Sequence, residues 1–288
     1  MQGAIKGEWL LLTATLFAAV GWVTSKYVLY EMPSNVFISG RFLIASSLLL
    51  PFCFRGIRQI AFQLFRKLIL IGALLATSIH VWVYAVSITD SLAEGAFIMS
   101  LAMIIAPLTQ WVILRVRPNV AFWLSLPMAI AGMMLLTLTN GWQIDESLGY
   151  FFLSSCLLSI HFVLNKRISA QVSPLPSICV QMFVVGLSGL LLYVLEGMPS
   201  VTVSHTTWGY FALATLIATA MRYLTQTVGQ RSTTIETASL IMILEPIWTL
   251  ILSFTLFEEQ LTLPKSIGSV LIMVSLYSYI TLSNKTRL

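Results

Sequence analysis

The stretch SLIMILEPIWTLILSFTLFEE, residues 239–259, places a carboxylate and a proline inside an otherwise uncharged run. Glu245 and Pro246 lie between Glu236 and Glu258, the nearest charged residues on either side. An apolar segment of this length matches the roughly 17–25 residues that a helix needs to cross a membrane. Because an ionised side chain at the bilayer centre costs about 2.5–3.5 kcal/mol, Glu245 is expected to face a bundle interior or a water-filled cavity.

The composition of the whole chain also indicates a membrane environment. Of the 288 residues, 58% are hydrophobic and 9% are charged, against about 25% charged residues in an ordinary soluble domain. Long stretches without Asp, Glu, Lys or Arg lie at 9–25, 68–89, 95–114, 118–144, 147–165, 168–195, 197–221 and 266–284. Two further stretches, 32–54 and 237–257, each contain one charge, Arg41 and Glu245.

These stretches predict an all-α membrane protein with ten transmembrane helices. The expected spans are about 8–28, 36–54, 67–87, 91–114, 119–140, 147–166, 177–195, 207–229, 236–257 and 263–283. The first span is expected to remain as an anchor, because its apolar run is longer than that of a signal peptide and continues through Trp22.

No pattern for a cofactor, a metal or a soluble catalytic domain occurs in the chain. Cys53, Cys156 and Cys179 all fall in predicted spans and lack the spacing of a disulfide framework or a metal site. HExxH, GxSxG, P-loop and Rossmann glycine motifs are missing, and the predicted loops are short. The sequence therefore predicts no cofactor, no metal and no soluble enzyme.

The distribution of positive charge predicts the orientation. With the N-terminus in the cytoplasm, most basic residues fall in cytoplasmic loops and tails: Lys6, Arg55, Arg58, Arg66, Lys67, Arg115, Arg117, Lys166, Arg167, Arg231, Lys285 and Arg287. This positive-inside bias predicts that both termini are cytoplasmic. The net charge of +5 is thus a topology signal, and no clustered basic patch indicates binding to nucleic acid.

The two halves of the chain resemble each other. SLAMIIAPLTQWVIL (100–114) and SLIMILEPIWTLIL (239–252) align with Pro107 against Pro246, and both prolines are expected to bend their helices. Lys26 and Lys166 end the first and sixth predicted spans. We predict two five-helix repeats, 1–141 and 142–288, with the second inverted because five is odd. Inverted repeats place a binding site near the midplane, where the halves meet.

With these features, the chain resembles the drug/metabolite transporter superfamily, and specifically its EamA-type members with ten helices in two repeats. The most characteristic segment is ETASLIMILEPIWTLILSFTLFEEQLTLPKSIGSVLIM (236–273), which is similar to the ninth and tenth spans of that family. Arg41, in FISGRFLIASSLLL, resembles an arginine often found in the second span. VILRVRP (112–118) departs from the family, because it lacks the acidic residue that commonly closes the fourth span.

The resemblance implies transport of small metabolites, amino acids or drugs across the bacterial inner membrane, commonly outward. It implies no particular substrate. The expected partners are therefore a small-molecule substrate and the lipid bilayer, with protons as a candidate coupling ion. The sequence does not define the oligomeric state.

Glu245 has two interpretations that the sequence leaves open. In one, its carboxylate contacts a substrate amine or carries a proton. In the other, it is a buried group held by a basic neighbour, for which Arg222 lies at a similar depth. Arg222 belongs to a polar stripe at helical spacing with Thr215, Thr219, Gln226 and Gly229. Arg222 could bind a substrate carboxylate or neutralise Glu245.

The third span carries a second polar stripe, with Thr77, His80, Tyr84 and Ser87 at spacings of 3, 4 and 3. A midplane histidine can exchange a proton under mild perturbation, so His80 is a candidate proton relay, although a hydrogen-bonded structural histidine is the commoner case. His161 in the sixth span is expected to be structural. Arg41, near the outer end of its span, is expected to be structural, with a side chain that could extend toward the membrane surface.

Aromatic residues complete the predicted site. Trp22, Tyr84, Trp111 and Trp248 could line a cavity and hold a ligand by stacking, although many membrane tryptophans anchor interfaces instead. We predict a secondary active or facilitative transporter of a small polar or amphipathic metabolite, an amino acid or a related compound, working in export by alternating access. The alternatives are an uptake carrier for a nucleotide-like or methyl-donor metabolite, and an intramembrane enzyme acting on an amphipathic substrate.

Overall fold

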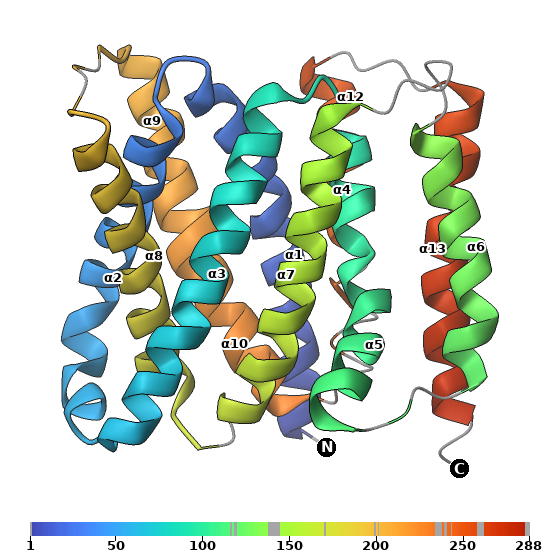
Figure 1. Ribbon diagram of the computed structural model, residues 1–288, viewed down its shortest axis with the longest axis horizontal. Helices are drawn as coiled ribbons and strands as arrows, with labels where there is room; N and C mark the ends of the chain where they lie inside the picture. The colour runs from blue at the N-terminus through green and yellow to red at the C-terminus, as the bar shows by residue number, and fades with distance from the viewer. Residues whose placement is uncertain are drawn as a thin grey trace.

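The protein, represented by a computed structural model, is a bundle of long helices that run side by side (Figure 1). The structure describes residues 2–115, 117, 120–137, 145–169, 171–198, 200, 202–233, 238, 241–242, 244–257 and 262–285. These residues form helices and connecting turns without a strand. The helices are α1 (Gln2–Leu29), α2 (Ser34–Arg58), α3 (Phe62–Ile88), α4 (Leu92–Ser100), α5 (Ala102–Leu114), α6 (Val120–Thr137), α7 (Glu146–Ser169), α8 (Pro174–Leu195), α9 (His205–Thr215), η2 (Leu216–Met221), α10 (Arg222–Ser232), α12 (Leu244–Phe257) and α13 (Leu263–Lys285).

The described part of the chain contains six helical segments that are long and apolar enough to cross a membrane. These segments are Gly7–Leu29, Ser34–Arg58, Phe62–Ile88, Leu92–Leu114, Glu146–Ile168 and Pro174–Leu195. Two shorter apolar helices, Val120–Gly132 and Leu244–Phe257, accompany them. The prediction of a multi-pass all-helical membrane protein is confirmed for these elements, and the number of ten spans stays a prediction.

Local sequence signals explain several helix ends. Ser91 and Ser204 are N-cap residues whose hydroxyl oxygens accept from the N–H groups of Glu94 and Thr207, as serine does at the start of many helices. Pro174 is in the first turn of α8, where its missing N–H has no helical partner to lose. The turns that are described in full, at 30–33, 59–61 and 89–91, are short, and the two termini lie at the same end of the bundle (Figure 1).

The fourth predicted span is divided into two helices. Residues 91–114 were expected to form one helix bent at Pro107, but α4 ends at Ser100 and α5 begins at Ala102. The break at Leu101 therefore lies about 1.7 turns before Pro107, which is inside α5. The N–H of Leu101 is bonded to the carbonyl of Ile98, which tightens the chain at this point.

Two helix pairs bring distant parts of the sequence together at close range. In the first pair, α8 packs against α2, and a Cβ added to Gly189 would lie 2.8 Å from the backbone nitrogen of Ser39. In the second pair, α6 packs against α13, and a Cβ added to Gly132 would lie 2.9 Å from the carbonyl oxygen of Gly268. Glycine thus permits backbone approaches that any side chain would prevent. Each pair joins one helix from either half of the chain.

Candidate functional site

A cavity of about 100 Å³ lies in the middle of the bundle. It is large enough for several water molecules or a small ligand, since one water needs about 10–15 Å³ of such space. Its walls come from α1, α2, α3, α4, α7, α8, α10 and α12, together with Met242. The lining residues are Ala18, Gly21, Trp22, Arg41, Ser78, Ile79, Trp82, Ala96, Met99, Ser100, Ser154, Leu158, His161, Phe162, Asn165, Ile178, Arg222, Tyr223, Gln226, Thr227, Gln230, Met242, Glu245 and Pro246.

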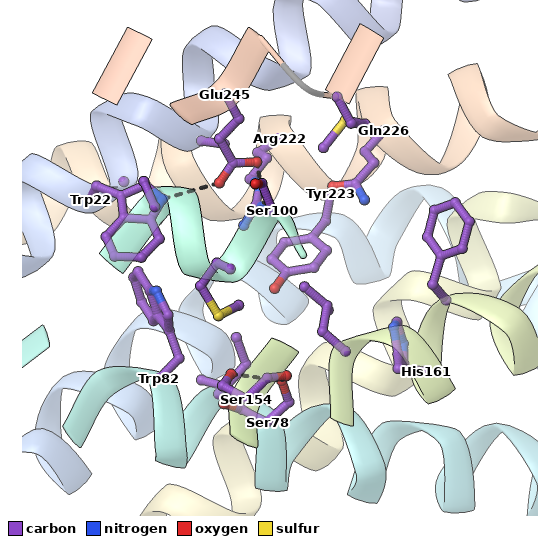
Figure 2. A pocket seen from close by; sticks show the side chains of 18 of the residues that line it. Trp22, Ser78, Trp82, Ser100, Ser154, His161, Arg222, Tyr223, Gln226 and Glu245 are labelled. Atoms are coloured by element: carbon purple, nitrogen blue, oxygen red, sulfur yellow. Dashed lines mark hydrogen bonds and ion pairs between the residues drawn. The ribbon is translucent and has the colours of Figure 1, made fainter. Parts of the chain in front are cut away.

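Glu245 lies in one wall of this cavity, beside Trp22 and Arg222 (Figure 2). It belongs to α12, and the described residues 241–242 just before this helix are helical as well. Its Oε1 accepts a hydrogen bond from Trp22 Nε1 at 3.0 Å, and its Oε2 lies 3.4 Å from Arg222 Nη2. Both charged side chains are about four-fifths covered, with 19% exposure for Arg222 and 17% for Glu245. The structure thus brings three of the predicted site residues together.

Arg222 occupies the first residue of α10, immediately after the π-helical turn η2. Its guanidinium lies over the ring of Tyr223, 5.1 Å from the centroid. One of its nitrogens, Nε, is buried and has no hydrogen-bond partner among the described residues. Guanidinium nitrogens only donate, so Arg222 presents an unused donor to the cavity.

The Arg41 side chain lies inside the bundle, 3% exposed, and the expectation that it extends toward the membrane surface is wrong. Its guanidinium donates to Ser25 Oγ at 3.0 Å, to the carbonyl oxygen of Ala218 at 3.2 Å, and to Thr219 Oγ1. Ala218 and Thr219 belong to η2, whose π spacing leaves carbonyl oxygens short of ordinary helical donors. Interior acceptors therefore satisfy Arg41, and it has no need to reach water.

Polar residues continue from Arg222 along α10. Gln226 and Gln230 follow at intervals of four residues, so the three side chains share one face of the helix and line the same cavity. Gln226 Oε1 and Gln230 Nε2 are buried without a hydrogen-bond partner among the described residues. Buried polar atoms are rarely left unbonded. This stripe thus indicates contact with a ligand or with water.

The opposite wall of the cavity contains small polar groups that are bonded to each other. Ser78 of α3 and Ser154 of α7 lie 3.1 Å apart, and each hydroxyl donates to the other residue's carbonyl oxygen. Deeper in α7, His161 Nε2 lies 2.8 Å from Gln181 Oε1. The Gln181 amide in turn donates to Asn165 Oδ1 at 2.9 Å. The expectation of a structural role for His161 agrees with this enclosed network.

The remaining predicted residues lie outside the cavity lining. His80 Nε2 is 3.0 Å from Ser188 Oγ, between α3 and α8. Thr77 is exposed and donates to the Ala73 carbonyl of its own helix. The Tyr84 and Trp111 side chains are 43% and 38% exposed. Trp248 is half-buried, and its Nε1 has no partner among the described residues.

The cavity extends from the midplane toward the end of the bundle that carries both termini. Its lining residues on α7 run from Ser154 to Asn165, in the direction of that end (Figure 1). On the other side of the cavity, the Trp22 ring packs edge-on against Trp82 at 5.1 Å and lies 5.4 Å from Phe151. Both tryptophans line the cavity.

No group of three His, Cys, Asp or Glu side chains with the arrangement of a metal site occurs within the described ranges. Site residues that the sequence did not single out include Ser78, Ser100, Tyr223 and Gln230. Serine and tyrosine are common in membrane helices, so only the rotation of each helix distinguishes a cavity residue from a packing residue. For Gln230, the spacing of four from Gln226 was the available signal.

Comparisons with known proteins identify the class to which this arrangement belongs. The sequence model of the EamA-like transporter family matches the chain twice, over residues 5–138 and 147–281. The chain is therefore a member of the EamA-like transporter family and has the two-repeat layout of that family. No curated protein matches the chain.

Solved structures support the fold. One of them, described only as the crystal structure of a protein, superposes with a TM-score of 0.73. The similarity covers 98% of this chain and 99% of the other, at 15% sequence identity. At this identity, the likeness shows the fold alone.

Proposed function

We propose that this protein is a secondary active or facilitative transporter that moves a small polar or amphipathic metabolite across the bacterial inner membrane. The observation that carries the proposal is the central cavity, which is lined by residues from both family matches and contains the Arg222–Glu245 ion pair. Ionisable groups inside membrane proteins are costly and usually serve a substrate or ion pathway. An amino acid or a related carboxylate is the class of compound that we propose for this cavity, which contains both charges and an aromatic wall.

The proposed mechanism is alternating access between two inverted repeats. The cavity extends toward the terminus-bearing end, and we propose that the Trp22–Trp82 contact closes it toward the other end. The positive-inside bias places the terminus-bearing end in the cytoplasm. The present arrangement is then inward-facing, and separation of the two tryptophans would open the cavity outward. We propose export as the direction of transport.

Two lysines support an inverted relationship between the halves. Lys26, near the end of α1, donates to the carbonyl oxygens of Val86 and Thr89 at the end of α3. Lys166, near the end of α7, donates to the carbonyl of Gln230 at 2.9 Å, at the end of α10. Both lysines thus bind the last carbonyls of a neighbouring helix, where the helix dipole favours a cation.

Proton coupling through His80 stays part of the proposal. Because His80 lies outside the cavity lining and contacts Ser188, a proton would have to reach the cavity through other groups. Transport at several pH values by a His80→Gln variant tests this role. Unchanged pH dependence would contradict it.

The function is tested with purified protein in proteoliposomes. A thermal-shift screen against metabolites finds ligands, since a ligand that binds the folded state raises its stability, and counterflow then tests each hit for transport. Glu245→Gln is expected to abolish counterflow while the variant still inserts and folds. Glu196→Gln, the same chemical change at an exposed position, is the matched control. Full activity of Glu245→Gln would show that the carboxylate charge is dispensable.

A further inference from the structure

The charged residues that line the cavity do not balance. They are Arg41, Arg222 and Glu245, with a formal sum of +1. Arg222 pairs with Glu245, whereas Arg41 bonds to neutral oxygens and lies near no carboxylate among the described residues. Burying an unpaired charge in a low-dielectric environment is unfavourable. A ligand with one negative charge would remove this excess.

The hydrogen-bonding capacity of the cavity leads to the same ligand class. Each carboxylate oxygen of Glu245 accepts one hydrogen bond, Oε1 from Trp22 and Oε2 from Arg222. A ligand ammonium group would have to share Glu245 with the Arg222 guanidinium, and the two positive charges would repel each other. Arg222 Nε, by contrast, is a buried donor without a described partner. Gln226 Oε1 is also without a described partner, but it is a neutral acceptor, so the unbalanced charge of the site is positive and favours an anion.

We propose that the substrate is a small organic monoanion whose carboxylate binds Arg222, an inference that rests on the proposed transport function. The contact between Arg222 and Glu245 is 3.4 Å long, beyond the roughly 2.7–2.9 Å of a strong charge-assisted hydrogen bond. A substrate carboxylate can therefore take two guanidinium donors while Glu245 keeps its bond to Trp22. Binding brings the formal charge of the cavity from +1 to zero, whereas a zwitterion leaves it at +1 and an amine raises it to +2.

Three probe compounds with one phenyl ring test this inference: 3-phenylpropionate, phenylalanine and 2-phenylethylamine. The ring suits a cavity lined by Trp82, Phe162 and Tyr223. Their dissociation constants are measured by thermal unfolding of the full-length protein in detergent. We expect 3-phenylpropionate to bind most tightly, then phenylalanine, then 2-phenylethylamine. The dissociation constants of the first and the last compound should differ by about tenfold or more. Equal or tighter binding of phenylalanine or the amine, or no saturable effect of 3-phenylpropionate, overturns the proposal.

Variants of the ion pair distinguish this inference from simple apolar binding. Glu245→Gln raises the formal charge of the cavity to +2, so it is expected to bind 3-phenylpropionate at least as tightly as the parent protein. Arg222→Gln is expected to lose the preference for the anion. Arg222→Lys keeps the charge but not the two-donor geometry. It should therefore retain the order of the three probes, with smaller differences between their dissociation constants. Loss of 3-phenylpropionate binding in Glu245→Gln, or an unchanged preference in Arg222→Gln, contradicts the proposal.

The binding measurements and the transport measurements can contradict the two proposals independently. If the three probes bind in the expected order but no carboxylate supports counterflow, the ligand class stands and the transport function fails. If counterflow occurs only with amines, the transport function stands and the anion proposal fails.

Discussion

The two halves of the chain place different chemistry at matching positions. In one, Trp22 of α1 donates to Glu245 of α12. In the other, the equivalent residues Phe162 of α7 and Ala106 of α5 pack in a single apolar cluster. Glu245 and Ala106 each precede a proline in the two aligned segments. The Phe162–Ala106 pair thus keeps the helix contact without the hydrogen bond and the charge of the Trp22–Glu245 pair.

A second matching pair shows the same difference. Arg41 of α2 donates to Ser25 of α1 at 3.0 Å. At the corresponding place in the other half, Gln181 of α8 donates to Asn165 of α7 at 2.9 Å. The neutral glutamine connects α8 to α7, the pair of helices that is equivalent to the α2–α1 pair connected by the charged arginine. Because the fold is maintained by uncharged residues in one copy, the charges in the other copy are better explained by a ligand than by the fold.

The largest expected effect comes from copying the neutral pair into the charged one. A Trp22→Phe/Glu245→Ala double variant reproduces Phe162 and Ala106. We expect it to insert and to elute as one species, with counterflow at least about 100-fold slower, since removal of one partner from a buried charge pair costs about 2–5 kcal/mol. Counterflow in proteoliposomes and size-exclusion chromatography measure the two outcomes. Transport close to the parent rate would show that the two halves are functionally equivalent.

The converse exchange tests whether the apolar copy can accept a charge. Ala106→Glu buries a carboxylate beside Phe162, which has no donor to offer it. We expect a loss of about 2.5–3.5 kcal/mol in the free energy of unfolding, the insertion cost of a charge at mid-bilayer. Unfolding in increasing SDS measures it.

Two further variants separate charge from size. Ala106→Gln adds the same volume without the charge and should be less harmful than Ala106→Glu. Adding Phe162→Trp to Ala106→Glu supplies the donor that Trp22 gives to Glu245 and should restore part of the lost stability. If Ala106→Gln is as unstable as Ala106→Glu, overpacking and not charge is the cause.

The Arg41 position provides a third, smaller effect. Arg41→Gln copies Gln181 and removes hydrogen bonds to Ser25 and to the Ala218 carbonyl. An unsatisfied buried group costs about 1–3 kcal/mol, and glutamine recovers part of this, so a loss of about 1–2 kcal/mol is expected. Arg231→Gln, the same replacement at an exposed site, should change stability by less than about 0.5 kcal/mol. A loss in Arg41→Gln no larger than in this control would show that the Arg41 network adds nothing.

The helices and the two-repeat layout could be predicted from the sequence because the bilayer requires long uncharged runs. Glu245, Arg222, Trp22 and Gln226 were identified as site candidates because charged and amide groups are rare in such runs. Their roles stay predictions until transport is measured. The break at Leu101 could not be predicted, because proline is the usual sequence signal for a helix bend and the proline of this span is Pro107.

The limits of the prediction lie in helix rotation. Lipid and cavity both accept aromatic rings, so hydropathy did not distinguish Trp22, which faces the cavity, from Trp111, which is 38% exposed. Likewise, the π turn at η2 changes the phase of the eighth span, and its acceptors keep Arg41 inside the bundle. Such features depend on contacts between helices that are distant in sequence.

The smallest expected effect concerns a charge outside the membrane-spanning segments. Glu31 follows α1, and the position that matches it in the other half is the uncharged Gln171. The Glu31 carboxylate accepts from the backbone N–H of Ser204 at 2.8 Å. Hydrogen bonds from the Ser204 backbone, and then from the Thr207 and Ser204 hydroxyls, lower the pKa of Glu31 below its ordinary value of 4.5. The ionised carboxylate thus ties the α1–α2 turn to the start of α9, across the two halves.

A lowered pKa in the folded state stabilises the protein above the unfolded-state pKa, and the contribution disappears as the pH falls through the folded-state value. Compared with Glu31→Gln, the parent protein should therefore have a slightly higher melting temperature at pH 6–7, about 1 °C or less, given that the site is fully exposed. This advantage should decline as the pH is lowered from about 4.5. Melting curves of both proteins between pH 3 and pH 7 measure the difference. A gap that is constant across this range would show that the ionisation of Glu31 does not stabilise this turn, so that the charge that distinguishes Glu31 from Gln171 has no role there.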